Sequence, residues 1–270
     1  MTRKTIWASA AILLVIIGLS MASPFLPLPD PDVQNIAERL QGPSAKHWFG
    51  TDEFGRDLLA RTLRGTRTSL MIAVSAAALA GVVGTALGTI GGYFRGMAEL
   101  ASMRFVDLLL VFPPIVLGIV VVGLLGSSKL HMILVIGLLN IAAFARLAFG
   151  STKAVQEMEF VQAARALGAS PARIIGLHIL PNILSPLVVQ FSLSIASGVL
   201  LESGLSFLGI GIAPPEASLG LMIGRGRGYL YQNPWYVLWP AMILSVIILC
   251  ANVLGDGLRD RLDPKLHGGR

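Results

Sequence analysis

Long runs without Asp, Glu, Lys or Arg dominate this chain and limit what it can fold into. Six such runs occur, at 5–29, 68–94, 108–128, 130–145, 174–201 and 228–255. A helix needs about 20 mostly apolar residues to cross the hydrocarbon core of a bilayer. Only 13% of the residues are charged, which is about half the share in an average soluble domain. The sequence therefore predicts an all-α, polytopic membrane protein.

We expect about six transmembrane helices, at roughly 6–23, 69–93, 105–126, 130–149, 184–206 and 236–255. The fourth helix can extend past Arg146 if its guanidinium reaches the membrane interface. Pro181 and Pro186 delay the start of the fifth. Arg3 and Lys4 precede the first run, as in a signal peptide, but no small-x-small cleavage site follows, so a retained signal-anchor is favoured.

The loop charges predict the orientation of the helices. Outside the connection at 24–68, most Lys and Arg fall on the same side as the N-terminus. Lys and Arg gather on the cytoplasmic side of helical membrane proteins, so both termini are expected in the cytoplasm. This bias also accounts for the net charge of +6. No basic and aromatic patch accompanies it, so nucleic acid is not expected as a partner.

The connection at 24–68 contains a candidate amphipathic helix within Asp57–Gly65. One side of this helix is mostly apolar and the other is charged: Leu58, Leu59, Thr62 and Leu63 against Asp57, Arg61 and Arg64. The pattern predicts a helix that lies on the membrane surface and ends at Gly65. A short helix packed against other outer loops is an equally good alternative.

Small residues mark one face of the second expected helix. Ala80, Gly84, Gly88 and Gly92 recur every four residues. A smooth face of this kind lets two helix backbones approach closely within a membrane. The stripe predicts a packed bundle and says nothing about function.

Two acidic residues are candidates for a pathway or gate through the membrane. Asp107 stands three residues after Arg104, so a local ion pair on one helix face is the alternative. Glu202 lies deeper in an apolar run. Carboxylates inside a membrane usually face a cavity or a partner, so a subunit contact is the alternative for Glu202.

Catalytic and metal-binding patterns do not stand out. The histidines are scattered and form no H-x-x-x-H pair: His47, His131, His178 and His267. No G-x-x-x-x-G-K-[ST] loop is present to bind phosphate, and the single cysteine, Cys250, lies in an apolar run. We therefore expect neither a metal nor a cofactor on this chain and no enzymatic activity. A membrane-embedded enzyme and a standalone channel are weaker alternatives.

The loop at about 150–183 has an order of its own. Four residues recur at helical spacing and give a short helix an apolar face: Phe160, Ala163, Ala164 and Leu167. Gly168 suits a helix C-terminus, and Ser170 with Pro171 suits the start of a second helix. The sequence predicts a helix–turn–helix that is apolar on one side. Simple cover for the membrane surface is the alternative.

This loop resembles one shared by the membrane-spanning subunits of ABC importers, which has E-A-A, three residues, G, nine residues, and I-x-L-P. The chain has Gln162-Ala163-Ala164, then Gly168, then His178-Ile179-Leu180-Pro181. Gln162 and His178 depart from the pattern, and the spacing is kept. The resemblance implies that the loop couples to an ATPase through Phe160, Gln162, Ala163, Ala164, Leu167, Gly168, Leu180 and Pro181.

Three further segments resemble the dipeptide/oligopeptide/nickel permease subfamily, most closely its C-type permease. They are His47–Asp57, Glu202–Gly209 with Pro214-Pro215, and Gly255–Asp260 followed by Leu262-Asp263-Pro264. The resemblance implies a type I ABC importer permease fold in a bacterial cytoplasmic (inner) membrane. It also divides the chain into an N-terminal helix with its external connection, 1–68, and a permease core, 69–270.

The same resemblance implies the partners of the chain. They are a second permease subunit in a heterodimer, two cytoplasmic ATPases that bind ATP and Mg, an external solute-binding protein and the lipid bilayer. Import of di- or oligopeptides is the leading interpretation. Import of nickel, free or chelated, is the alternative, because members of the subfamily that carry either substrate share these motifs.

Overall fold

The computed structural model describes residues 3–262. Ten α-helices are found there: α1 (Arg3–Ala22), α2 (Leu58–Tyr93), α3 (Met97–Val111), α4 (Pro114–Leu125), α5 (Lys129–Gln156), α6 (Glu159–Ala166), α7 (Pro171–Ile174), α8 (Leu180–Phe207), α9 (Leu219–Gly226) and α10 (Trp235–Leu262). Five helices are long and apolar enough to cross a membrane, and the bent pair α3–α4 can supply a sixth. The all-α, polytopic class is confirmed.

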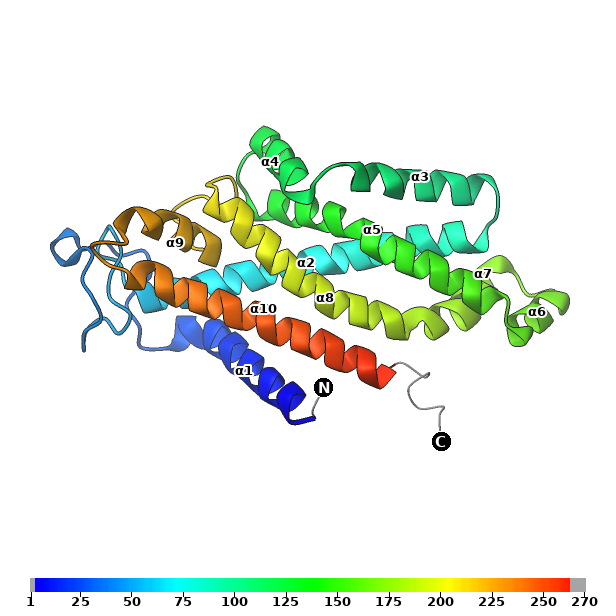
Figure 1. The fold of residues 1–270 in the computed structure, drawn as a ribbon, viewed down its shortest axis with the longest axis horizontal. Coiled ribbons are helices and arrows are strands. Elements are labelled where there is room, and N and C mark those ends of the chain that lie inside the picture. Colours follow the sequence, from blue (N-terminus) through cyan, green and yellow to red (C-terminus); the bar gives the residue numbers. More distant parts are fainter. Residues whose placement is uncertain (1–2, 263–270) are drawn as a thin grey trace.

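The long helices run alongside one another and give the molecule two distinct ends (Figure 1). The connection at 23–57 and α9 lie at one end, and α6 and α7 lie at the other. The start of α1 lies beside the end of α10, where Ile6 packs against Gly257. Lys265 and Arg270, and Asp263 and Pro264 of the carboxy-terminal motif, lie outside the described residues.

The expected surface helix at Asp57–Gly65 is wrong, because these residues form the N-terminal cap and first two turns of α2. Asp57 caps α2, and its Oδ1 accepts a hydrogen bond of 2.8 Å from Ala60 N. Gly65 does not end the helix. A Cβ there would stand 3.1 Å from the backbone of Ser218, so the glycine permits close packing against the start of α9.

The charged side of this segment faces the folded connection instead of water. Arg61 donates to Pro31 O at 2.9 Å, and Arg64 donates to Asp32 at 2.6 Å. Asp52 is fully buried and accepts a hydrogen bond of 2.6 Å from Arg56 Nε. Arg61 Nε lies 3.4 Å from the same Asp52 oxygen. The connection therefore closes over the N-terminal end of α2 as a folded cap.

The third span, expected as one helix at 105–126, is broken. α3 and α4 meet at an angle of 89°. Phe112 and Pro113 separate them in extended conformation, and Pro114 starts α4. Proline lacks the N–H that a continuous helix needs and clashes with the preceding turn, which explains the break.

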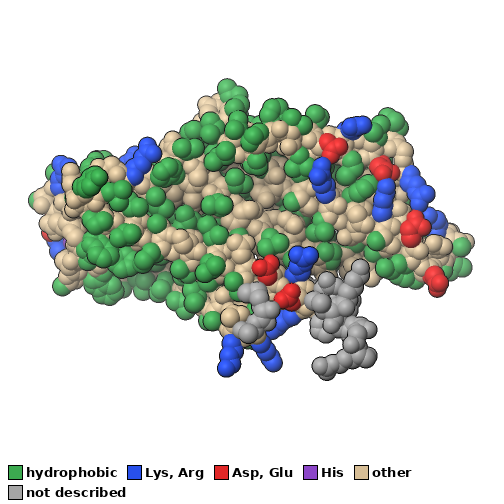
Figure 2. All heavy atoms as spheres, in the orientation of Figure 1, with side chains coloured by type: hydrophobic (Ala, Val, Ile, Leu, Met, Phe, Trp, Pro, Cys, Tyr) green, Lys and Arg blue, Asp and Glu red, His purple; other side chains and the backbone are tan. Residues whose placement is uncertain are grey.

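The small-residue stripe on α2 packs against α5, as predicted. A Cβ on Gly88 would lie 2.2 Å from Ala145 O, and one on Gly84 would lie 2.7 Å from Ile141 O. Ala80 is fully buried in the same interface. Apolar side chains cover much of the middle of the face seen in Figure 2, and acidic and basic side chains gather toward α3 and α6 and where α1 starts and α10 ends.

Candidate functional site

The helix–turn–helix expected in the loop at about 150–183 is present at one end of the bundle, as α6 and α7. α6 ends in a Schellman motif, in which Ala169 N donates to Ala164 O at 3.1 Å and Gly168 N donates to Arg165 O at 3.0 Å. Gly168 has a φ of +83°, a left-handed conformation that glycine adopts without strain. The chain therefore reverses tightly directly behind α6.

The second half of the motif begins as the sequence predicts. Ser170 caps α7, its Oγ accepting a hydrogen bond from Arg173 N, and Pro171 occupies the first turn. A π-helical turn at Ile175–Ile179 joins α7 to α8. Leu180 and Pro181, predicted as part of the coupling loop, form the first turn of α8.

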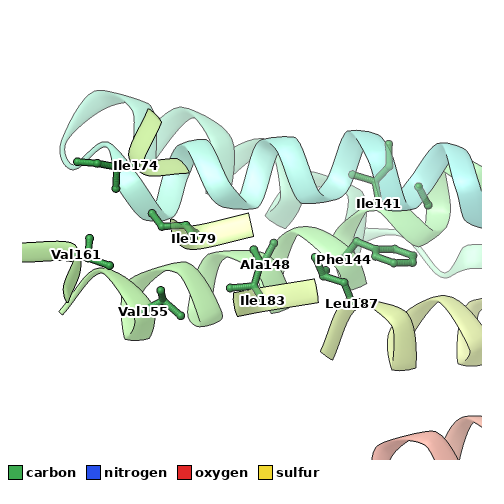
Figure 3. Close-up of a cluster of buried hydrophobic side chains, with 10 residues drawn as sticks. Ile141, Phe144, Ala148, Val155, Val161, Ile174, Ile179, Ile183 and Leu187 are labelled. Carbon is green, nitrogen blue, oxygen red and sulfur yellow. The ribbon is translucent and has the colours of Figure 1, made fainter. Parts of the chain in front are cut away.

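α6 presents two different apolar surfaces. Val161 is fully buried and joins a core cluster that also contains Val155, Ile174 and Ile179 (Figure 3). Phe160 and the C-cap residue Leu167 are 43% and 88% exposed. Val161 thus anchors the helix to the bundle, the Phe160 ring lies 6.1 Å from the His178 ring between their centres, and Leu167 points outward.

The remaining residues of the predicted loop site lie around this exposed face. Ala163 is exposed and Ala164 is half-buried. Gln162 donates from Nε2 to Glu157 O at 3.0 Å, so its amide supports the start of α6. The small side chains leave the face shallow, which suits close contact with another protein surface.

Glu202 lies inside the helix bundle, on α8, with no exposed surface. Its carboxylate accepts hydrogen bonds from Ser69 Oγ at 2.6 Å and Ser206 Oγ at 2.7 Å, and Ser203 Oγ lies 3.3 Å away. Ser69 belongs to α2 and also accepts from Leu219 N of α9 at 3.4 Å. Glu202 therefore links α2, α8 and α9, and its role in a gate stays a prediction.

Asp107 pairs with an arginine on another helix. Its carboxylate lies 2.9 Å from Arg146 on α5, so the alternative interpretation, a local pair with Arg104, is wrong, and a role of Asp107 in a pathway or gate stays a prediction. Both partners are about half exposed in the chain alone. Pairing between helices is favoured here because α3 packs along α5, which sequence spacing does not reveal.

An apolar groove of about 760 Å³ opens between α2 and α8, with Phe144 of α5 in its lining. Leu180 of the predicted loop site also lines it, together with Leu184 and Val188. Neither Glu202 nor Asp107 lines this groove. Sequence reasoning missed the groove, which forms from three helices far apart in the chain.

The sequence matches a model of the family described as "Binding-protein-dependent transport system inner membrane component" over residues 84–268. The chain is 39% identical over 260 residues to the probable D,D-dipeptide transport system permease protein DdpC of Escherichia coli K12, covering 96% of this chain and 87% of that protein. It is 42% identical over 264 residues to the oligopeptide transport system permease protein OppC of Mycobacterium bovis, covering 97% and 90%.

The fold also matches a solved structure. The MetNI methionine ABC transporter, in an inward-facing conformation, has a chain that superimposes with a TM-score of 0.62 at 17% identity, covering 76% of this chain and 98% of that one. This likeness shows that the chain has the fold of a type I ABC importer permease. The family match covers more than half of the sequence and includes α6 and Glu202, so the chain belongs to the family of binding-protein-dependent transport system inner membrane components.

Proposed function

We propose that this chain is the transmembrane permease subunit of an ATP-driven importer that carries di- or oligopeptides across the cytoplasmic membrane. The exposed apolar face of α6, at one end of a membrane helix bundle, is the observation that supports this most directly. Relatives named as dipeptide and oligopeptide permeases, about 40% identical over most of the chain, favour peptides over nickel.

The proposed complex contains four kinds of protein. A second permease subunit pairs with this chain, two cytoplasmic ATPases hold ATP and Mg, and an external solute-binding protein delivers the substrate. The chain itself holds no cofactor in this proposal. Energy released on the ATPases reaches the membrane through α6, because a soluble ATPase can act on the bundle only through a contiguous contact.

Uptake by whole cells tests the substrate. Cells with and without this chain are given a labelled dipeptide, a labelled oligopeptide or labelled nickel, with the partner proteins present in both. We expect peptide uptake to require the chain and nickel uptake to be unaffected. Nickel uptake that depends on the chain, with no change for peptides, would overturn the substrate assignment.

We also propose that both termini lie in the cytoplasm and that the connection at 23–57 lies outside. Ala45 and Ala172 are exposed at opposite ends of the molecule, and the native Cys250 is buried. Ala45→Cys should react with an impermeant thiol reagent in intact cells, and Ala172→Cys should react only after the membrane is opened. The reverse labelling pattern would invert the topology.

Docking of α6 on an ATPase is tested with Ala164→Trp. The half-buried Ala164 lies on α6, and overpacking a fitted contact costs about 1–3 kcal/mol. That cost weakens a subunit interface roughly five- to 150-fold, so the ATPases should be lost on purification. Ala45→Trp, on the opposite end, is the matched control. Normal ATPase recovery with Ala164→Trp would remove α6 from the interface.

A further inference from the structure

The inner side of α6 touches the end of α2 through one basic residue. Arg165 lies one turn after the buried Val161 and so shares its side of the helix. The guanidinium carbon of Arg165 lies 5.5 Å from the centre of the Tyr93 ring. This is cation–π distance, and Tyr93 is the last residue of α2. Arg165 is exposed, but its guanidinium reaches back to the bundle at Tyr93, whereas Leu167, which is 88% exposed, points outward.

A hollow of about 690 Å³ separates α6 from the end of α2. Its lining includes Tyr93 and Arg95 on one side and Gln162 and Arg165 on the other. Side chains do not fill this space, so the two helices do not pack directly at this point. The angle between them consequently depends on the few side chains that bridge the hollow.

Two other interactions lie beside the hollow. One joins different helices, and the other is an exposed ion pair. Gln156 Nε2 donates to Gly92 O at 2.9 Å within a buried site, but this bond ties α5 to α2. Arg95 and Glu157 form an ion pair of 2.8 Å in which the side chains are 75% and 63% exposed. Exposed ion pairs contribute little. The Arg165–Tyr93 contact joins α6 itself to α2, and Tyr93 also packs against the core cluster that contains Val161 of α6.

α2 is well placed to carry a displacement through the molecule. It runs for 36 residues without interruption. Ser69 ties it to Glu202 of α8, and Asp57 caps its other end beneath the folded connection. A change in the angle of α6 that reaches Tyr93 therefore reaches a helix that spans the whole bundle.

We propose that Arg165 is a positioning residue that, with Tyr93, fixes α6 against α2 so that movement of the docked ATPase is transmitted along α2. This inference rests on the proposed function. It assigns Arg165 to coupling and not to ATPase binding, because its guanidinium reaches the Tyr93 ring at the end of α2.

The complete transporter, reconstituted in liposomes with its ATPases and binding protein, provides the test. The quantity measured is the number of labelled peptides taken up per ATP hydrolysed. Arg165→Gln removes the charge, and Tyr93→Leu removes the ring. Each variant should lower the number of peptides taken up per ATP at least about threefold, with the ATPases recovered normally. The double variant should have a ratio no lower than that of the more impaired single variant.

Conservative variants sharpen the assignment. Tyr93→Phe keeps the ring and should keep the wild-type ratio. Arg165→Lys keeps the charge and should give a ratio between those of Arg165→Gln and the wild type. Glu157→Gln removes the exposed ion pair and serves as the matched control, with a near wild-type ratio. Tyr93→Phe failing as badly as Tyr93→Leu would overturn the ring contact.

Three results would contradict the proposal. They are a normal ratio in both Arg165→Gln and Tyr93→Leu, losses that multiply in the double variant, or loss of the ATPases from Arg165→Gln. The last result would place Arg165 in the ATPase interface. Failure of the proposed function would be seen separately, as absent peptide uptake by the wild-type transporter.

Discussion

The two ends of α2 differ in how much charge this chain buries around them. At the N-terminal end Asp52 is fully buried and Arg56 and Arg61 are each only 3% exposed, and all three are joined by ion pairs. At the C-terminal end the neighbouring α6 leaves Leu167 88% exposed. Buried charges and exposed large apolar side chains are the informative departures from an ordinary protein surface.

The difference concerns charge, because large apolar side chains are exposed at both ends: Val33 and Trp48 in the connection at 23–57 are 63% and 68% exposed. The connection buries the charges that lie over the start of α2. The α6 end holds one side of its helix with Val161 and exposes the other. The proposed ATPase contact uses the exposed side of α6, and the buried charge cluster lies at the opposite end of the bundle.

The largest expected effect comes from breaking the buried charge cluster between the connection at 23–57 and the start of α2. Asp52→Asn keeps the side-chain shape but leaves Arg56 and Arg61 buried without their carboxylate. Removing one partner of a buried pair costs about 3–5 kcal/mol. We expect a large fall in the thermal unfolding temperature of the purified chain. Glu157→Gln, in the exposed ion pair at the other end, should change the unfolding temperature little. Equal losses in the two variants would contradict the difference in charge burial between the two ends.

A smaller effect is expected midway along α2, at Glu202. Glu202→Leu leaves the hydroxyls of Ser69 and Ser206 without their acceptor, and each buried group left unpaired costs about 1–3 kcal/mol. Unfolding in denaturant should reveal a loss in this range. Glu202→Gln keeps an acceptor oxygen and should retain most of the stability.

Transport by the Glu202→Gln variant addresses the predicted gate. If the charge acts in a pathway, uptake falls although the fold and the assembly are retained. Unchanged uptake would leave Glu202 as a link between α2, α8 and α9 alone.

A local effect is expected at the turn behind α6. A side chain at Gly168 would meet no atom within 4 Å, so Gly168→Val acts through its φ of +83° and not through a clash. A left-handed conformation costs a residue with a side chain roughly 1–2 kcal/mol. Amide hydrogen exchange in α6 should become faster and ATPase recovery should fall. Asparagine tolerates this conformation better than valine. Gly168→Asn should therefore give an exchange rate and an ATPase recovery between those of Gly168→Val and the wild type.

The sequence predicts the features of this protein that depend on neighbouring residues. Hydrophobic length gives most of the spans, and the cap at Ser170 and the glycine at 168 give the turn behind α6. The break at Pro113 was also within reach, because two adjacent prolines cannot continue a helix. The expectation of one straight helix at 105–126 did not take these two prolines into account.

The features that sequence analysis missed depend on distant residues. Arg61 and Arg64 appeared to face water because the residues that cover them lie about 30 positions earlier, at Pro31 and Asp32. Ser69 is 133 residues from Glu202, with no pattern to connect them. Ser206, four residues after Glu202 on the same helix, was the one partner that helical spacing could have suggested.

The smallest expected effect concerns the rim of the connection at 23–57, where charges remain in water. Lys46 donates a hydrogen bond to Glu38, and this bond is the main reason that the pKa of Glu38 lies below its ordinary value. A carboxyl with a lowered pKa in the folded state stabilises the fold above its unfolded pKa of about 4.3, and the contribution disappears as pH falls through the lower folded value. Lys46→Gln should therefore reduce stability slightly at pH 6 and not at pH 3, as measured by the unfolding temperature at both values. A loss from Lys46→Gln as large as that from Asp52→Asn would mean that the rim stabilises the connection at 23–57 as much as the buried cluster does.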